Sequence, residues 1–142
     1  MKDVITKEHV FAHPIDKVWN AISLAEEIST WFIKADFKAE KGYQYTFTSS
    51  EEHGCLNITG EVKSASPYTL IYTWIVENTT TETVVKWDLK ETNEGTKLFL
   101  EHSGISNYPG DSAITYFNNY SGGWTECIEK LTEFLTKEVH AG

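Results

Sequence analysis

Residues 111–137 read DSAITYFNNYSGGWTECIEKLTEFLTK, and this segment is the most informative part of the sequence. Its apolar side chains recur at steps of three and four residues, which is the spacing of one face of an α-helix. A helix of about 25 residues, rising about 1.5 Å per residue, is roughly 37 Å long and can cross a whole β-sheet. The apolar positions are Ala113, Phe117, Tyr120, Trp124, Cys127, Ile128, Leu131 and Leu135.

Two adjacent glycines, Gly122 and Gly123, interrupt this helical pattern directly before Trp124. Two glycines inside a helix cost about 2 kcal/mol relative to alanine. A helix that keeps them is expected to bend there or to approach another backbone closely. Two interpretations stay open, a flexible gate beside a binding pocket and a packing notch under a bulky strand residue such as Trp87.

The residues before this helix predict a β-sheet. From about Lys34 onward apolar and polar side chains alternate, as they do in strands with one buried face. Val85, Trp87 and Leu89 give the clearest case, with polar or smaller residues between them. Short turns separate the runs, and consecutive strands joined by short turns pair antiparallel, because parallel strands need long crossovers. Gly60 interrupts one run and predicts a bulge or a bend.

The N-terminal residues predict a strand over residues 3–12 and then two short helices, the second over residues 25–31. Pro14 suits the first turn of a helix. The apolar stripe of the first helix is Ile15, Val18, Trp19 and Ile22. The full order predicts an α+β helix-grip fold, in which a curved antiparallel sheet of about six to seven strands is covered by the long C-terminal helix packed across it.

Length and composition limit the classes of protein that fit. We expect residues 1–142 to form one domain, with a monomer favoured. The formal charge is −9 and all 12 basic residues are lysine, which argues against nucleic-acid binding because arginine supplies many of its contacts. Charged residues near the start and the lack of a long apolar run predict a cytoplasmic protein without a membrane span.

Aromatic residues make up 13% of the chain, and strand and helix spacing directs many of them toward the gap between the sheet and the last helix. Ligand pockets are mostly apolar and aromatic, with a few placed polar groups. We therefore predict an apolar ligand pocket in this gap, with ordinary core packing as the alternative. The candidate ligand-binding residues are Trp31, Phe32, Tyr45, Phe47, Trp74, Trp87, His102, Phe117, Tyr120 and Trp124.

His102 shares a strand face with Leu98 and Leu100, so its side chain is expected to point inward. It could orient a ligand carbonyl or act as a general base. The alternative is a structural histidine bonded to the backbone, and spacing assigns it no carboxylate partner.

The cysteines and the other histidines predict no further chemistry. Cys127 lies on the apolar stripe of the last helix, which predicts an inert buried thiol, and we read Cys55 in the same way. His9 and His13 bracket a strand in which four residues span about 13 Å, too far for one metal ion. Since no nucleotide, zinc or nucleophile motif occurs, we expect no cofactor.

Several segments together carry a family resemblance. They are residues 11–19 (FAHPIDKVW), 26–32 (EEISTWF), 67–74 (PYTLIYTW), 95–98 (GTKL), 101–104 (EHSG), and Gly123-Trp124 followed by Leu131. In this order they resemble the START-like superfamily, and the chain looks like a stand-alone homologue of the activator of the heat-shock protein 90 ATPase. Tyr68 stands where that family usually carries arginine.

The resemblance implies a helix-grip fold with an internal cavity, and it implies no single activity. Members of the superfamily include lipid carriers, plant allergens that hold flavonoids or hormones, polyketide cyclases and co-chaperones. The leading hypothesis is a binding protein for a small lipid, polyketide or flavonoid-like molecule. The alternatives are a co-chaperone-like domain that binds a chaperone through its acidic surface, and a cyclase or hydrolase that uses His102.

Overall fold

The computed structural model describes residues 4–51, 54–66, 68–77 and 80–141, with side chains at all of these except 49–51, 54–56 and 137–141. The order of elements confirms the predicted α+β arrangement. The elements are β1 (Ile5–Phe11), α1 (Ile15–Ser23), α2 (Ala25–Trp31), β2 (Lys34–Asp36), β3 (Gln44–Glu51), β4 (Gly54–Ser66), β5 (Thr69–Val76), β6 (Thr83–Thr92), β7 (Gly95–Ser103), the 3-10 turn η1 (Ile105–Asn107) and α3 (Ser112–Ala141).

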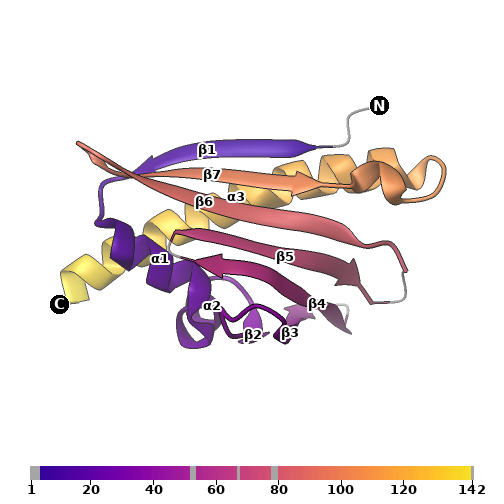
Figure 1. Cartoon of the computed structure of the whole chain (residues 1–142), viewed down its shortest axis with the longest axis horizontal. Coiled ribbons are helices and arrows are strands. Elements are labelled where there is room, and N and C mark those ends of the chain that lie inside the picture. The colour runs from indigo at the N-terminus through magenta and orange to yellow at the C-terminus, as the bar shows by residue number, and fades with distance from the viewer. Residues whose placement is uncertain (1–3, 52–53, 67, 78–79, 142) are drawn as a thin grey trace.

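The strands form one antiparallel sheet in the order β1-β7-β6-β5-β4-β3-β2. Strands β2 to β7 follow one another as the predicted meander. β1, the first of the described strands, pairs with the free edge of β7, so that Ile5 lies opposite His102. Figure 1 shows the sheet as a curved layer in front of α3, which runs diagonally behind it.

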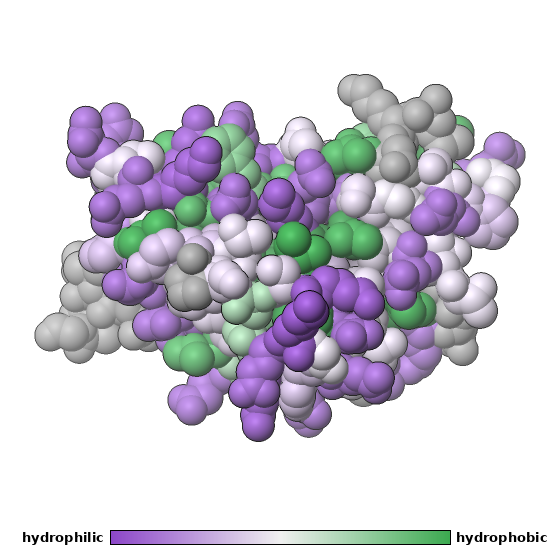
Figure 2. Space-filling model, viewed as in Figure 1, coloured by the Kyte–Doolittle hydropathy of each residue, from purple (hydrophilic) through white to green (hydrophobic). Residues whose placement is uncertain are grey.

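Alternate residues of β6 separate the two faces of the sheet. Val85, Trp87 and Leu89 are buried on the inner face, whereas Lys86 and Asp88 are half-exposed on the outer face. The outer face carries hydrophilic side chains around smaller hydrophobic areas (Figure 2). This one-sided burial is typical of an antiparallel sheet that is covered on one face only.

The long helix covers the inner face and ends later than the sequence predicted. Trp124, Leu131 and Leu135 are buried along one side of it, and the helix continues to Ala141. None of the helices in the described part of the chain combines the length and apolar character needed to cross a membrane.

The two short helices close one end of the space between sheet and helix. The indole Nε1 of Trp31, at the end of α2, donates a hydrogen bond of 2.8 Å to the carbonyl of Ala21 in α1. The ammonium of Lys17 in α1 donates to the carbonyl of Leu135 in α3, also at 2.8 Å. These hydrogen bonds link α1 to both α2 and α3.

Tyr68, just before β5, contacts a carboxylate through a neutral phenol at the position where the resembled family usually carries arginine. Its hydroxyl donates a hydrogen bond of 2.6 Å to Oδ1 of Asp16. The ring of Trp19 packs against it edge to face, with centroids 6.1 Å apart. The sheet is thus joined to α1 by a phenol–carboxylate bond and a ring contact.

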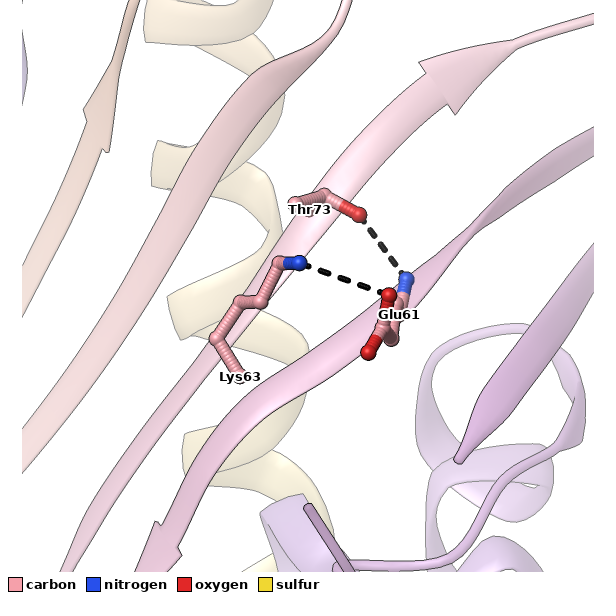
Figure 3. Close-up of polar contacts among 3 residues, drawn as sticks. All are labelled: Glu61, Lys63 and Thr73. Carbon is pink, nitrogen blue, oxygen red and sulfur yellow. Dashed lines mark hydrogen bonds and ion pairs between the residues drawn. The ribbon is translucent and has the colours of Figure 1, made fainter. Parts of the chain in front are cut away.

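Gly60 marks a close approach of β4 and β5. A Cβ atom at this position would lie 2.1 Å from the carbonyl oxygen of Thr73. The hydroxyl of Thr73 accepts a bond of 2.8 Å from the backbone N–H of Glu61, and Lys63 pairs with the Glu61 carboxylate at 3.3 Å (Figure 3). The register shift lies after Val62, so the irregularity predicted at Gly60 falls further along the strand.

Candidate functional site

A pocket of about 210 Å³ lies between the inner face of the sheet and α3. The segment directly after α2, together with β4, β5 and α3, contributes to its wall. The lining residues are Phe32, Ile33, Ile58, Trp74, Tyr120, Gly123 and Trp124. None of these described lining residues is charged, so the pocket suits an uncharged, largely apolar group.

Four of the predicted candidates meet at this pocket, namely Phe32, Trp74, Tyr120 and Trp124. The ring centroids of Trp74 and Trp124 lie 5.5 Å apart, and those of Phe32 and Trp124 lie 6.2 Å apart. Ligand contact by these four residues stays a prediction. Ile33 and Ile58 were not predicted, because their only signal in the sequence is that they are apolar.

The other predicted candidates lie outside the pocket. Tyr45 and Phe47 are each 1% exposed, and both rings pack against Phe37 and Tyr72. Aromatic side chains therefore fill much of the space between sheet and helix. The remaining candidates outside the pocket are Trp31, Trp87, His102 and Phe117.

The two glycines of α3 do not make the close approach that the sequence predicted. Both are exposed, and none of the described atoms outside the helix backbone lies within 4 Å of a Cβ placed on either. The interpretation of the two glycines as a packing notch under Trp87 is therefore wrong. Only Gly123 of this pair lines the pocket, where the missing side chain leaves its rim open.

Both ring nitrogens of His102 are occupied by side chains. Trp124 donates its Nε1–H to Nδ1 at 3.0 Å, so Nδ1 carries no proton. The proton is therefore on Nε2, which lies 2.7 Å from the hydroxyl of Thr83. That hydroxyl donates onward to the carbonyl of Trp74 at 3.2 Å. This chain fixes one neutral tautomer of a fully buried histidine.

The environment of His102 does not suit a general base. Burial lowers its pKa to about 4, and neither nitrogen has a free lone pair or an open side for a ligand. The alternative of a structural histidine fits the geometry, although its partners are side chains of β6 and α3 instead of the backbone. Its effect on the pocket is indirect, because it holds Trp124 in place.

Because of this histidine, the free energy of unfolding should decrease as the pH is lowered. The folded pKa of about 4 lies below the ordinary 6.5, so between these values the unfolded chain binds a proton that the folded protein does not. Unfolding free energy is then lost as the pH is lowered, by about 1.4 kcal/mol per pH unit and about 3 kcal/mol in total.

Urea unfolding of the wild type and of His102→Gln across this pH range measures the effect. The difference between the two curves isolates His102 from the many carboxylates that titrate in both proteins. We expect the wild-type curve to be the steeper one, and parallel curves would contradict the assignment.

Tyr120 and Trp74 are lining residues of the pocket whose side chains carry a hydroxyl and an indole N–H. The hydroxyls of Tyr120 and Tyr108 lie 2.8 Å apart and share one hydrogen bond. Burial raises the pKa of Tyr120, so its hydroxyl stays protonated. The indole N–H of Trp74 is buried and has no hydrogen bond of normal geometry among the described residues. It lies close enough to the Tyr120 hydroxyl to oppose, in part, the rise that burial causes in the pKa of that hydroxyl.

Cys127 is buried, and burial raises the pKa of its thiol to about 12, which agrees with the predicted inert thiol. The side chain of Cys55 lies outside the described residues, as do His53 and the side chain of His140. Within the described chain, no group of three or more His, Cys, Asp or Glu side chains is placed to hold a metal ion.

A larger groove of about 530 Å³ lies between β1 and α3. Most of its lining residues are charged or polar, whereas those of the smaller pocket are mainly apolar and aromatic, so the smaller pocket suits an apolar molecule better. The lining residues are Lys7, Glu8, His9, Thr125, Ile128, Glu129, Thr132 and Glu133.

Comparison with known proteins gives a family and several similar structures. A family model described as activator of Hsp90 ATPase homolog 1-like protein matches residues 12–136. Protein MLL2253 from Mesorhizobium loti is 29% identical, with a TM-score of 0.81 over 94% of this chain and 97% of that one. Protein BH1534 from Bacillus halodurans is also 29% identical, with a TM-score of 0.75 over 95% and 97%.

A third similar structure, protein NE0264 from Nitrosomonas europaea, has a TM-score of 0.81 over 97% of each chain. At 19% identity it shows a shared fold only. The search of curated proteins gave no match.

Proposed function

Because this chain belongs to the activator of Hsp90 ATPase homolog 1-like family, we propose that it binds a small apolar molecule in the pocket between the sheet and α3. The observation that carries the proposal is an uncharged, aromatic opening in a region that is otherwise tightly packed. The family and its fold support a domain of the ligand-binding type. A lipid, polyketide or flavonoid-like molecule fits this chemistry.

The size of the pocket limits what it encloses. Its volume of about 210 Å³ is below the roughly 300–1,000 Å³ of drug-sized sites. It therefore surrounds a small flat ring system, or one end of a longer molecule whose remainder leaves past Gly123. Burial of such a group against Phe32, Trp74 and Trp124 supplies the binding energy.

A leucine at position 123 should block the pocket, whereas a leucine at position 122 should not. Both glycines are exposed on the same helix and have free space around a Cβ, but only Gly123 lines the pocket. Both variants remove one helix-interior glycine, so their helices should be similarly stabilised. We expect Gly123→Leu to weaken binding of a neutral apolar probe by roughly tenfold or more, which is about 1.4 kcal/mol.

Tryptophan fluorescence and thermal stabilisation with flavone, fluorenone and dodecanol measure this binding, since a ligand of the folded state raises stability by mass action. The proposal fails if none of these probes binds to the wild type. It also fails if Gly122→Leu and Gly123→Leu weaken binding equally.

A second candidate function follows from the family match, whose description names an activator of an Hsp90 ATPase. In this case a chaperone of the Hsp90 type would bind the outer surface of a chain with a net charge of −9. Charge-steered binding weakens as salt is added. A pull-down at low and high salt tests it, and Gly123→Leu should leave the pull-down unchanged because the pocket takes no part.

A further inference from the structure

The indole of Trp74 forms part of the pocket wall, and it carries a donor without a normally placed acceptor. The side chain is 5% exposed, and its Nε1 has no hydrogen-bond partner among the described residues. Buried donors without an acceptor are uncommon in folded proteins because water solvates them in the unfolded chain. This donor therefore needs an explanation.

Other buried tryptophans of the chain each have an acceptor. Trp31 donates to a backbone carbonyl at 2.8 Å, Trp87 donates to the hydroxyl of Tyr72 at 2.9 Å, and Trp124 donates to His102 at 3.0 Å. The packing of this fold thus satisfies indole N–H groups at three positions and leaves one unsatisfied at the pocket.

Neither of the acceptors beside Trp74 makes a hydrogen bond of normal geometry with its N–H. Nδ1 of His102 accepts from Trp124, and the hydroxyl of Tyr120 shares its hydrogen bond with Tyr108. The ring centroids of Trp74 lie 5.7 Å from His102 and 6.2 Å from Tyr120, so both residues border the indole without capping it. A molecule in the pocket could supply an acceptor that is better placed than the Tyr120 hydroxyl.

We propose that the ligand carries a neutral carbonyl oxygen that accepts the N–H of Trp74, on a flat apolar ring system that fills the rest of the pocket. This inference rests on the proposed function and names the chemical class of the ligand. A carbonyl oxygen accepts without bringing a proton that needs its own acceptor. It would convert an unsatisfied buried donor into a satisfied one.

The charge of the pocket favours a carbonyl over a carboxylate. The described lining residues include no lysine or other cation, and the neighbouring His102 is held neutral by its two side-chain partners. A buried carboxylate without a positive partner is strongly unfavourable. The pocket should therefore prefer ketones to hydrocarbons of the same shape, and also to acids of the same ring system.

Three probes with one ring skeleton test this preference. Fluorenone has a carbonyl, fluorene has a methylene group in its place, and a fluorene carboxylic acid carries a negative charge. Calorimetric titration of the wild type should show fluorenone binding roughly tenfold more tightly than fluorene. The carboxylate should be the weakest of the three.

The site of contact is read from the indole N–H signals in a proton–nitrogen correlation spectrum. Fluorenone should move the Trp74 signal to higher frequency, as a new hydrogen bond does, and fluorene should move it less. Trp74→Phe assigns that signal and should abolish the advantage of fluorenone over fluorene. Trp19→Phe is the matched control, because Trp19 does not line the pocket, and it should keep the advantage.

The outcomes separate this inference from the proposed function. Equal binding of fluorenone and fluorene to the wild type would overturn the carbonyl inference and leave an apolar binding site standing. Binding by none of the probes would overturn both. Because the comparison of probes uses the wild type, it decides the question even if Trp74→Phe folds poorly.

Discussion

Gly60→Ala is expected to destabilise the protein by about 3 kcal/mol or more, which is at the upper end of what overpacking costs. The new Cβ would lie 2.1 Å from the carbonyl oxygen and 2.7 Å from the carbonyl carbon of Thr73. These are backbone atoms of a paired strand, so they cannot rotate away as a flexible side chain would. The same carbonyl accepts the hydroxyl of the fully buried Tyr45, and moving it would disturb that bond.

Urea unfolding of Gly60→Ala beside Gly122→Ala measures this effect against a control with the same chemical change. Gly122 is exposed in a helix with open space around a Cβ, so alanine should stabilise the protein there by up to about 1 kcal/mol. The two substitutions should therefore have opposite signs. A neutral Gly60→Ala would mean that β4 and β5 can separate without loss.

His102→Leu is expected to destabilise the protein by about 3 kcal/mol. Leucine removes the acceptor of the buried Trp124 indole and leaves that N–H unpaired, which costs about 1–3 kcal/mol, and the changed shape of the side chain adds to this. The Thr83 hydroxyl is affected less, because it keeps the carbonyl of Trp74 as its own acceptor.

A double-mutant cycle with Trp124→Phe separates the hydrogen bond from the packing. Phenylalanine removes the N–H donor, so the double variant has neither an unpaired donor nor an unpaired acceptor at this bond. We expect the double variant to be more stable than the sum of the two single effects predicts, by about 1–2 kcal/mol. Additive effects would show that the bond between Trp124 and His102 contributes nothing measurable.

Much of the fold is visible in the sequence because it depends on periodicity. The change from helical to alternating spacing near Lys34 and the alternation around Trp87 both predict elements that the structure contains. The short η1 turn and the register shift after Val62 were not predicted. Both depend on how neighbouring segments meet in space, which single-strand spacing does not record.

The site could be predicted only in part, for a related reason. Phe47 and Trp74 alternate inward in the same way and their rings lie 6.3 Å apart, yet only Trp74 borders the pocket. Spacing tells which face a ring occupies, and it does not tell whether the space beside that ring is filled. Likewise, alternation placed His102 inside, but its partner Trp124 comes from another element.

The pairing of β1 with β7 has a consequence for the order in which the protein can fold during synthesis. Of the described strands β1 is made before the others, and its partner strand is made only after the whole meander, since Ile5 pairs with His102. Such distant pairings form slowly because a long loop must close first. Until then β1 is a nascent strand with unsatisfied edges, and it is the segment that a holding chaperone would have most reason to shield.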